Sequence, residues 1–214
     1  MTGIARIARF SLTSLDPARL ARFYVDALGF TQTALLREEA DPYGVQGQAT
    51  IHRLSLGEQE LELVGFEQLG RPYPADSTSH DVWFQHLAIV TADMEAAHAR
   101  LAAQDGWQTI TRGGAPVLLP GSSGGVTAFK FRDPEGHPLE LLSFPVGEAP
   151  PHWTNVSAPG PCIGLDHSAI VVTDSARSIA FYGALGFSVS TRSSNYGPAQ
   201  DLSLIHISEP TRPY

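Results

Sequence analysis

Four side chains stand at matching positions in two stretches of the chain, where they could hold a metal ion. The first stretch offers Arg9 and, 53 residues later, Glu62; the second offers His86 and, 54 residues later, Glu140. Neutral imidazole and carboxylate groups suit Zn²⁺, Fe²⁺, Mn²⁺ or Ni²⁺. A His and a Glu on otherwise apolar strand faces cost free energy unless they are paired or bound to metal. The pattern therefore indicates a metal site or a charged cluster.

Arg9 is the exception in this set, because a guanidinium group cannot bind a metal. It could instead neutralise Glu62 or Glu140, or bind a substrate carboxylate through two parallel hydrogen bonds. The residues alone leave three readings open: an occupied metal site, an arginine–carboxylate cluster, or a buried His86 without a function. Either glutamate could also move a proton if its pKa lies near the working pH.

The same strand pattern opens three repeats, and the elements must be built from that unit. Apolar runs starting at Arg9, His86 and His167 each end in an Asp seven residues later. A helical run follows each Asp and closes at a Gly followed by Phe or Trp. The starts are separated by 77 and then 81 residues. A repeat at a near-constant period predicts one repeated structural unit.

Each complete unit reads as β-α-β-β-β. The Asp after the first strand is a good helix N-cap, and the Gly after the helix suits a left-handed C-cap. Period-two alternation and turn residues mark the remaining strands. The expected strands are 7–15, 32–38, 50–56 and 59–66 in the first unit, and 84–91, 108–112, 126–132 and 138–144 in the second.

These units predict an α+β fold in which paired βαβββ repeats form a cup-shaped, mixed β-sheet half-barrel, followed by a truncated third repeat. Units one and two facing each other would bring the first and last strands of both into one cup. The expected parts are a two-unit module at 4–146 (repeats 4–67 and 82–146), a Pro-rich linker at 147–162, a truncated start of a second module at 163–201, and a tail at 202–214. The tail resembles translated sequencing-adapter sequence, so we expect it to be an artefact.

Composition narrows the class of protein. The chain has 214 residues and a formal net charge of −8, which argues against nucleic acid or an anionic membrane as a partner. A single cysteine, Cys162, excludes an internal disulfide and favours a reducing compartment. No signal peptide or membrane-spanning run is visible, so we expect a cytoplasmic protein. The incomplete third repeat should expose a strand edge and an apolar helix face, which could support a homodimer.

The repeated unit resembles the vicinal oxygen chelate superfamily. The resemblance rests on the strand pattern His-x-x-Ile-Val-x-x-Asp, the helix end Phe-Tyr-x-x-x-Leu-Gly-Phe, and the hairpin Phe131–Leu142. It covers residues 4–146 and the start of a further module at 163–190. The superfamily includes glyoxalase I, extradiol ring-cleaving dioxygenases, methylmalonyl-CoA epimerase, and bleomycin- and fosfomycin-resistance proteins.

The resemblance implies metal ligands at His86 and Glu140, with Glu62 as a third. It also implies that His167 is a ligand of a second site whose other members lie beyond this chain. The implied function is a divalent-metal enzyme, dioxygenase-like or glyoxalase-, lyase- or isomerase-like, acting on a small molecule with vicinal oxygens. Glu140 and Glu62 would be catalytic and Arg9 would bind substrate. The alternatives are a metal-free binding module of the bleomycin-resistance type and an inactive fragment of a two-module enzyme.

Overall fold

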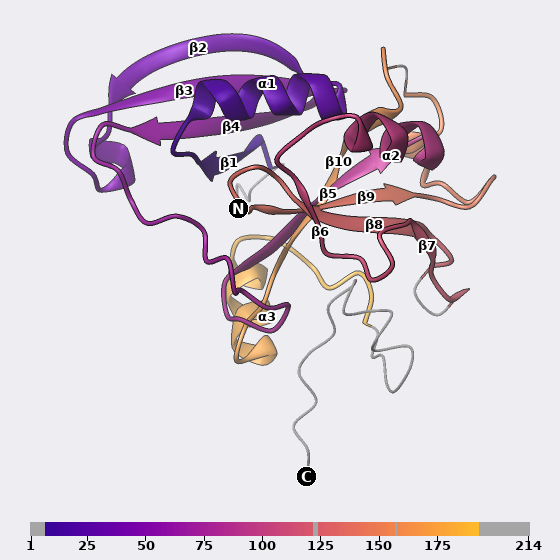
Figure 1. Ribbon diagram of the computed structural model, residues 1–214. Helices are drawn as coiled ribbons and strands as arrows, with labels where there is room; N and C mark the ends of the chain where they lie inside the picture. The colour runs from indigo at the N-terminus through magenta and orange to yellow at the C-terminus, as the bar shows by residue number, and fades with distance from the viewer. Residues whose placement is uncertain (1–6, 122–123, 157, 193–214) are drawn as a thin grey trace.

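The computed structural model describes residues 7–121, 124–156 and 158–192 (Figure 1). The expected tail at 202–214 and the end of the third repeat at 193–201 lie outside the described residues. Within the described ranges, no helix has the length and apolar character needed to cross a membrane.

Repeat one has the predicted β-α-β-β-β order, and repeat two has the same order with one additional short strand, β7. Repeat one contains β1 (Arg9–Thr13), α1 (Pro17–Leu28), β2 (Thr31–Glu39), β3 (Gln48–Leu56) and β4 (Gln59–Phe66). Repeat two contains β5 (Phe84–Thr91), α2 (Met94–Ala102), β6 (Gln108–Thr109), β7 (Val117–Leu118), β8 (Thr127–Arg132) and β9 (Pro138–Ser143). The third repeat supplies β10 (Cys162–Ile170) and α3 (Ser175–Ala184). The short β7 pairs with β8.

The three helices begin at the predicted Asp caps, but only α1 ends at the predicted glycine, since the C-caps of α2 and α3 are Ala103 and Leu185. The side chain of Asp16 accepts a hydrogen bond from Arg19 N at 2.9 Å, and Asp93 and Asp174 cap α2 and α3 in the same way. Gly29 ends α1 with φ +79°, a backbone conformation that favours glycine. In all three repeats, therefore, an Asp side chain caps the first turn of the helix.

The strands form two sheets, one from repeat one and the other from repeat two together with β10 of repeat three. One sheet has the order β1-β4-β3-β2, and the other has the order β10-β5-β9-β8-β6. The first strand of repeat two thus pairs with the first strand of repeat three, antiparallel, rather than with β1. Figure 1 shows the first sheet, in indigo and purple, set apart from the second sheet.

Repeats one and two instead meet through their helices and the inner faces of their sheets. Helices α1 and α2 contact each other, and one apolar core joins both repeats. This core includes Tyr24 from α1, Leu61 from β4 and Phe129 from β8, all fully buried. Burial of this shared core stabilises the joint and leaves β1 at the edge of its own sheet.

A hydrogen-bonded hairpin adds a polar joint between these repeats. Glu135, in the turn between β8 and β9, accepts hydrogen bonds from Ser14 Oγ at 2.8 Å and Asp16 N at 2.9 Å. His137 Nδ1 lies 2.8 Å from Asp133 Oδ2, and its Nε2 lies 2.9 Å from the carbonyl oxygen of Thr13. The buried His137 is therefore a structural residue.

The third repeat leaves its helix uncovered. Phe181 of α3 is 61% exposed, whereas Phe23, in the corresponding Phe-Tyr pair of α1, is 7% exposed. In Figure 1, α3 lies away from α1 and α2. The predicted exposure of an apolar helix face in this repeat is therefore present in the structure.

We expect His137 to stabilise the fold more at acidic than at alkaline pH. Burial favours the neutral ring, but the hydrogen bond and charge of Asp133 outweigh it and raise the pKa of His137 above its ordinary 6.5. A raised pKa contributes stability below the unfolded-state value, and this contribution is lost as pH rises through the folded-state pKa. The stability gap between wild type and His137→Asn, measured by urea unfolding, should be larger at about pH 6 than at about pH 9. A gap that is constant or grows with pH would contradict this.

A methyl group at Gly164 should disturb the attachment of β10. A Cβ there would lie 2.4 Å from Trp153 Cζ3 and 2.6 Å from Gln59 Oε1. Gly164→Ala should therefore destabilise the protein by about 1–3 kcal/mol, the usual cost of overpacking. Gly70→Ala is the matched control, because nothing lies within 4 Å of a Cβ at Gly70. Equal unfolding midpoints for the two variants would refute the close packing described here.

Candidate metal centre

Strand β5 is the element that assembles the candidate site. It pairs in parallel with β9, which sets Ala88 opposite Glu140, and antiparallel with β10, which sets His86 opposite Ala169. Because side chains alternate along a strand, His86 points away from the side of Leu87, which packs in the core. Glu140 likewise alternates with the core residues of β9. The two ligand candidates therefore share the face opposite the core.

A β-bulge brings His167 to that same face. Leu165 pairs with Ile89 and Ser168 pairs with Leu87, so β10 advances three residues while β5 advances two. Directly opposed residues point to one side, so Ser168 points with Leu87 and His167 points with His86. Without the extra residue, His167 would stand opposite Leu87 and face the core. Bulges commonly re-aim a side chain near a functional site in this way.

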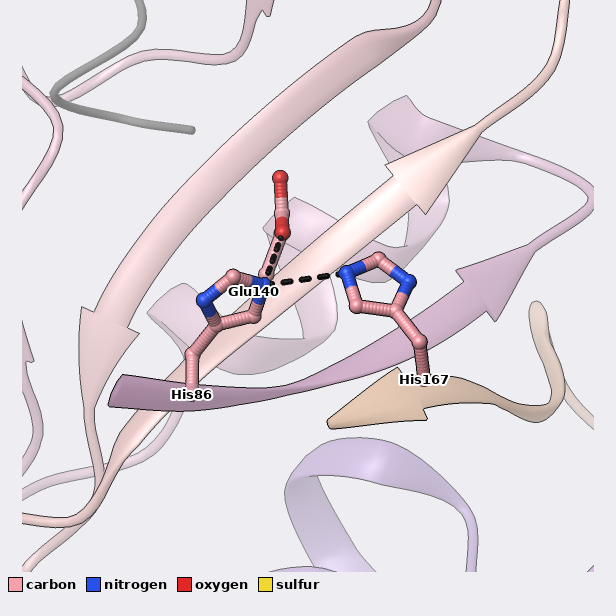
Figure 2. Close-up of side chains that lie close together, drawn as sticks. All are labelled: His86, Glu140 and His167. Atoms are coloured by element: carbon pink, nitrogen blue, oxygen red, sulfur yellow. Dashed lines mark hydrogen bonds and ion pairs between the residues drawn. The ribbon is translucent and has the colours of Figure 1, made fainter. Parts of the chain in front are cut away.

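The three side chains converge on a small volume, which we call the metal triad: His86, Glu140 and His167. His86 Nε2 lies 2.8 Å from Glu140 Oε2 and 3.1 Å from His167 Nε2. One ligand atom from each residue lies within 4.8 Å of the other two. Figure 2 shows the three side chains, from three different strands, pointing toward one another.

The triad is buried at one end and open at the other. His86 and Glu140 are 2% and 0% exposed, whereas the His167 side chain is 40% exposed. Burial lowers the pKa of His86 to about 4, a shift that the hydrogen bond to Glu140 only partly opposes. His86 is therefore neutral at pH 7, which is the form that binds metals. The exposed end at His167 gives a ligand access to the triad.

Each imidazole ring has an oxygen acceptor beside its Nδ1 atom. His167 Nδ1 lies 2.7 Å from Asp166 Oδ2, and Asp166 Oδ1 accepts a hydrogen bond from Trp153 Nε1 at 3.0 Å. The Nδ1 atom of His86 faces Gln85 Oε1. With both Nδ1–H groups donating, both Nε2 lone pairs would point at the same space, 3.1 Å apart. A cation there would relieve their repulsion, so the donor set fits a divalent metal.

Lys130 lies beside the triad and was not singled out by the sequence analysis. It is 2% exposed, and its Nζ lies 3.2 Å from His86 Nδ1 and 3.9 Å from Glu140 Oε2. Burial lowers the pKa of Lys130 to about 8, although the charge of Glu140 opposes the shift. Its place between Phe129 and Phe131, both core residues, predicts only that it faces away from the core, as a solvated lysine would, so nothing in the sequence signalled its burial.

Arg9 and Glu62 form a separate group in the other sheet. Glu62 Oε1 accepts hydrogen bonds from Arg9 Nη1 at 2.6 Å and from Arg53 Nε and Nη2 at 3.0 and 2.8 Å. We call Arg9, Arg53 and Glu62 the arginine cluster. Burial alone would raise the pKa of Glu62, but the two guanidinium groups outweigh it and lower the pKa. The structure thus places Glu62 with arginines, whereas His167, expected to lack partners, joins His86 and Glu140.

Comparison with known proteins supports the fold described above. The family model for the Glyoxalase/Bleomycin resistance protein/Dioxygenase superfamily matches residues 6–141. Glyoxalase I from Zea mays has 22% sequence identity and a TM-score of 0.55, covering 85% of this chain and 55% of the maize chain. An integron cassette protein from V. cholerae has 21% identity and a TM-score of 0.45, covering 68% of this chain and 99% of its own. No protein with curated annotation is significantly similar.

The family match and the maize structure confirm the predicted α+β fold of βαβββ units. At 22% identity, the maize structure supports the fold alone, and this chain spans about half of the maize chain. The residues of the site must therefore carry any argument about chemistry.

Cys162 offers a test of how firmly β10 is attached at the end that leads to the triad. It is 1% exposed, pairs with Thr91 of β5, and burial raises its pKa to about 12. The thiolate is the reactive form, so at about pH 8 only about one thiol in 10⁴ is ionised. We expect labelling by a maleimide to be at least about 100-fold slower in the folded protein than in urea. Comparable rates would show that β10 is not held against β5.

Proposed function

We propose a metal-dependent enzymatic function for this chain, which belongs to the Glyoxalase/Bleomycin resistance protein/Dioxygenase superfamily. The metal would be held by the metal triad, and the substrate would be a small molecule with two adjacent oxygen atoms. The proposal rests on one observation: two imidazole nitrogens and one carboxylate offer ligand atoms within 4.8 Å of one another. Two histidines and one carboxylate suit Fe²⁺ best, and the same donors accept Zn²⁺, Mn²⁺ or Ni²⁺.

Each residue around the triad would contribute a different group to the site. A bound divalent ion would act as a Lewis acid on the substrate oxygens. His86 and Glu140 supply a neutral nitrogen and a negative oxygen from the buried end of the site. His167 supplies the second nitrogen at the exposed end, where a substrate can approach, and Asp166 fixes the orientation of its ring. Burial of His86 and Glu140 keeps water from that side of the reacting groups.

Of the two glutamates predicted to be catalytic, Glu140 is the better placed. It belongs to the triad, whereas Glu62 is bound by Arg9 and Arg53. A general base works best with a pKa near the operating pH, and the lowered pKa of Glu62 makes it a weaker base. A proton-transfer role therefore stays a proposal for Glu140, and the role of Glu62 is to neutralise two arginines.

The arginine cluster favours a second function for repeat one, namely metal-free binding of an anionic group. The side chain of Arg9 is 39% exposed, so part of its guanidinium group remains open to a ligand. A carboxylate or similar anion could bind there through two parallel hydrogen bonds. This keeps Arg9 as a proposed substrate-binding residue, at a place distinct from the triad.

Metal binding should depend on all three triad residues. The full chain is stripped with a chelator, incubated with Fe²⁺, Mn²⁺, Ni²⁺ or Zn²⁺, and its metal content measured by mass spectrometry. We expect about one ion per chain in the wild type and at least about tenfold lower affinity in His86→Ala, Glu140→Gln and His167→Ala. His152→Ala is the matched control, because His152 is exposed and lies outside the triad.

Two results would refute the metal-dependent function. One is a wild-type protein that binds none of the four ions. The other is undiminished binding in His86→Ala and Glu140→Gln, because the ion would then occupy a different place. In either case the metal-free binding function becomes the stronger proposal, with Arg9 as its first test.

A further inference from the structure

The two sheets place the arginine cluster and the metal triad at equivalent positions. In repeat one, Glu62 on β4 stands opposite Ser11 on one side and Arg53 on the other. In repeat two, Glu140 on β9 stands opposite Ala88 of β5 on one side and Lys130 of β8 on the other. Arg9 precedes Ser11 by two residues, as His86 precedes Ala88. Lys130 therefore occupies the position of Arg53, and His86 the position of Arg9.

Repeat one shows what a cation at this position does. Arg53 places two nitrogen atoms within 3.0 Å of the same oxygen of Glu62, at Nε and Nη2. Together with Arg9, it neutralises a carboxylate that is only 4% exposed. In repeat one, the guanidinium group of Arg53 on β3 thus lies beside the carboxylate of Glu62, where a bound metal ion would otherwise neutralise it.

Repeat two puts Lys130 in contact with a histidine as well as a glutamate. Its Nζ lies 3.2 Å from His86 Nδ1, while Gln85 Oε1 faces the same nitrogen. An ammonium can only donate a hydrogen bond, and this amide oxygen can only accept one. The two neighbours therefore favour opposite tautomers of the neutral His86 ring.

Only one of these tautomers can bind a metal through Nε2. When Lys130 donates to Nδ1, the ring proton is on Nε2, where Glu140 Oε2 accepts it at 2.8 Å. When Nδ1 carries the proton and donates to Gln85, the Nε2 lone pair is left for a metal. The contacts around His86 thus contain partners for a metal-free state and for a metal-bound state.

We propose that Lys130 is a positioning residue that holds His86 in the tautomer unable to bind metal, and that Gln85 supports the tautomer that binds it. The consequence for affinity rests on the proposed metal function of the triad. Lys130 also repels an incoming divalent cation, because its ammonium lies 3.9 Å from the Glu140 oxygen that the cation would share. Lys130 therefore sets how tightly the site binds metal, and Gln85 acts in the opposite direction.

The tautomer is measured first, in the metal-free protein. Nitrogen-15 chemical shifts of labelled histidine report which ring nitrogen carries the proton, and loss of a signal in His86→Asn assigns the ring. Wild type should show the proton on Nε2, and Lys130→Met should move it to Nδ1. Lys130→Arg should restore the wild-type tautomer, because repeat one carries arginine at the same position. An identical tautomer in wild type and Lys130→Met overturns the proposal whether or not metal binds.

Metal affinity is then measured by competition with a chelating dye. Substitution of Lys130 and substitution of Gln85 should change this affinity in opposite directions. Lys130→Met should tighten binding by about 10-fold or more, and Gln85→Leu should weaken it by about 10-fold, the usual range for groups that orient a ligand. Circular dichroism checks that each variant is folded. Weaker binding in Lys130→Met overturns the proposal. Failure of wild type to bind any ion refutes the metal function instead, and the tautomer measurement still decides the role of Lys130.

Discussion

Strand β5 must hydrogen-bond along both of its edges for the site to exist. Its parallel partner β9 carries Glu140, and its antiparallel partner β10 carries His167. Neither partner adjoins it in the sequence, so the site is a product of sheet order. The inner face of β5 is held by the core shared with repeat one, which includes Leu87 and Ile89. The same strand therefore connects the apolar interior to the polar face where His86, Glu140 and His167 meet.

The two repeats show how one backbone arrangement can support two kinds of chemistry. Each repeat buries a glutamate on its last strand. That strand lies between the first strand of the repeat and a strand that carries a basic residue, β3 in repeat one and β8 in repeat two. In repeat one the neighbours are guanidinium groups, which keep their charge at any ordinary pH and satisfy the carboxylate permanently. In repeat two the neighbours are two histidines and a lysine, so no guanidinium group holds this carboxylate. Residue type, rather than fold, separates a structural ion cluster from a candidate metal site.

The parts of this architecture that depend on local sequence could be predicted. Asp16 and Gly29 marked the ends of a helix, alternation marked the strands, and the pairing of first and last strands brought His86 near Glu140. The partner of β5 could not be predicted, because the first strands of all three repeats carry the same pattern. The choice among them is a tertiary effect that no single strand encodes. The bulge at His167 depends on that pairing and was missed with it. The contacts of Lys130 arise within repeat two, where β9 pairs with both β5 and β8.

The site depends on β10 pairing with β5 in the bulged register that turns His167 toward His86. Nuclear Overhauser contacts between backbone protons, recorded on the isotope-labelled full chain, test this pairing directly. We predict cross-strand contacts between Leu165 and Ile89 and between Ser168 and Leu87. Contacts that instead place His167 opposite Leu87 would turn its ring toward the core. That result, or the absence of contacts between the two strands, would contradict the bulged pairing.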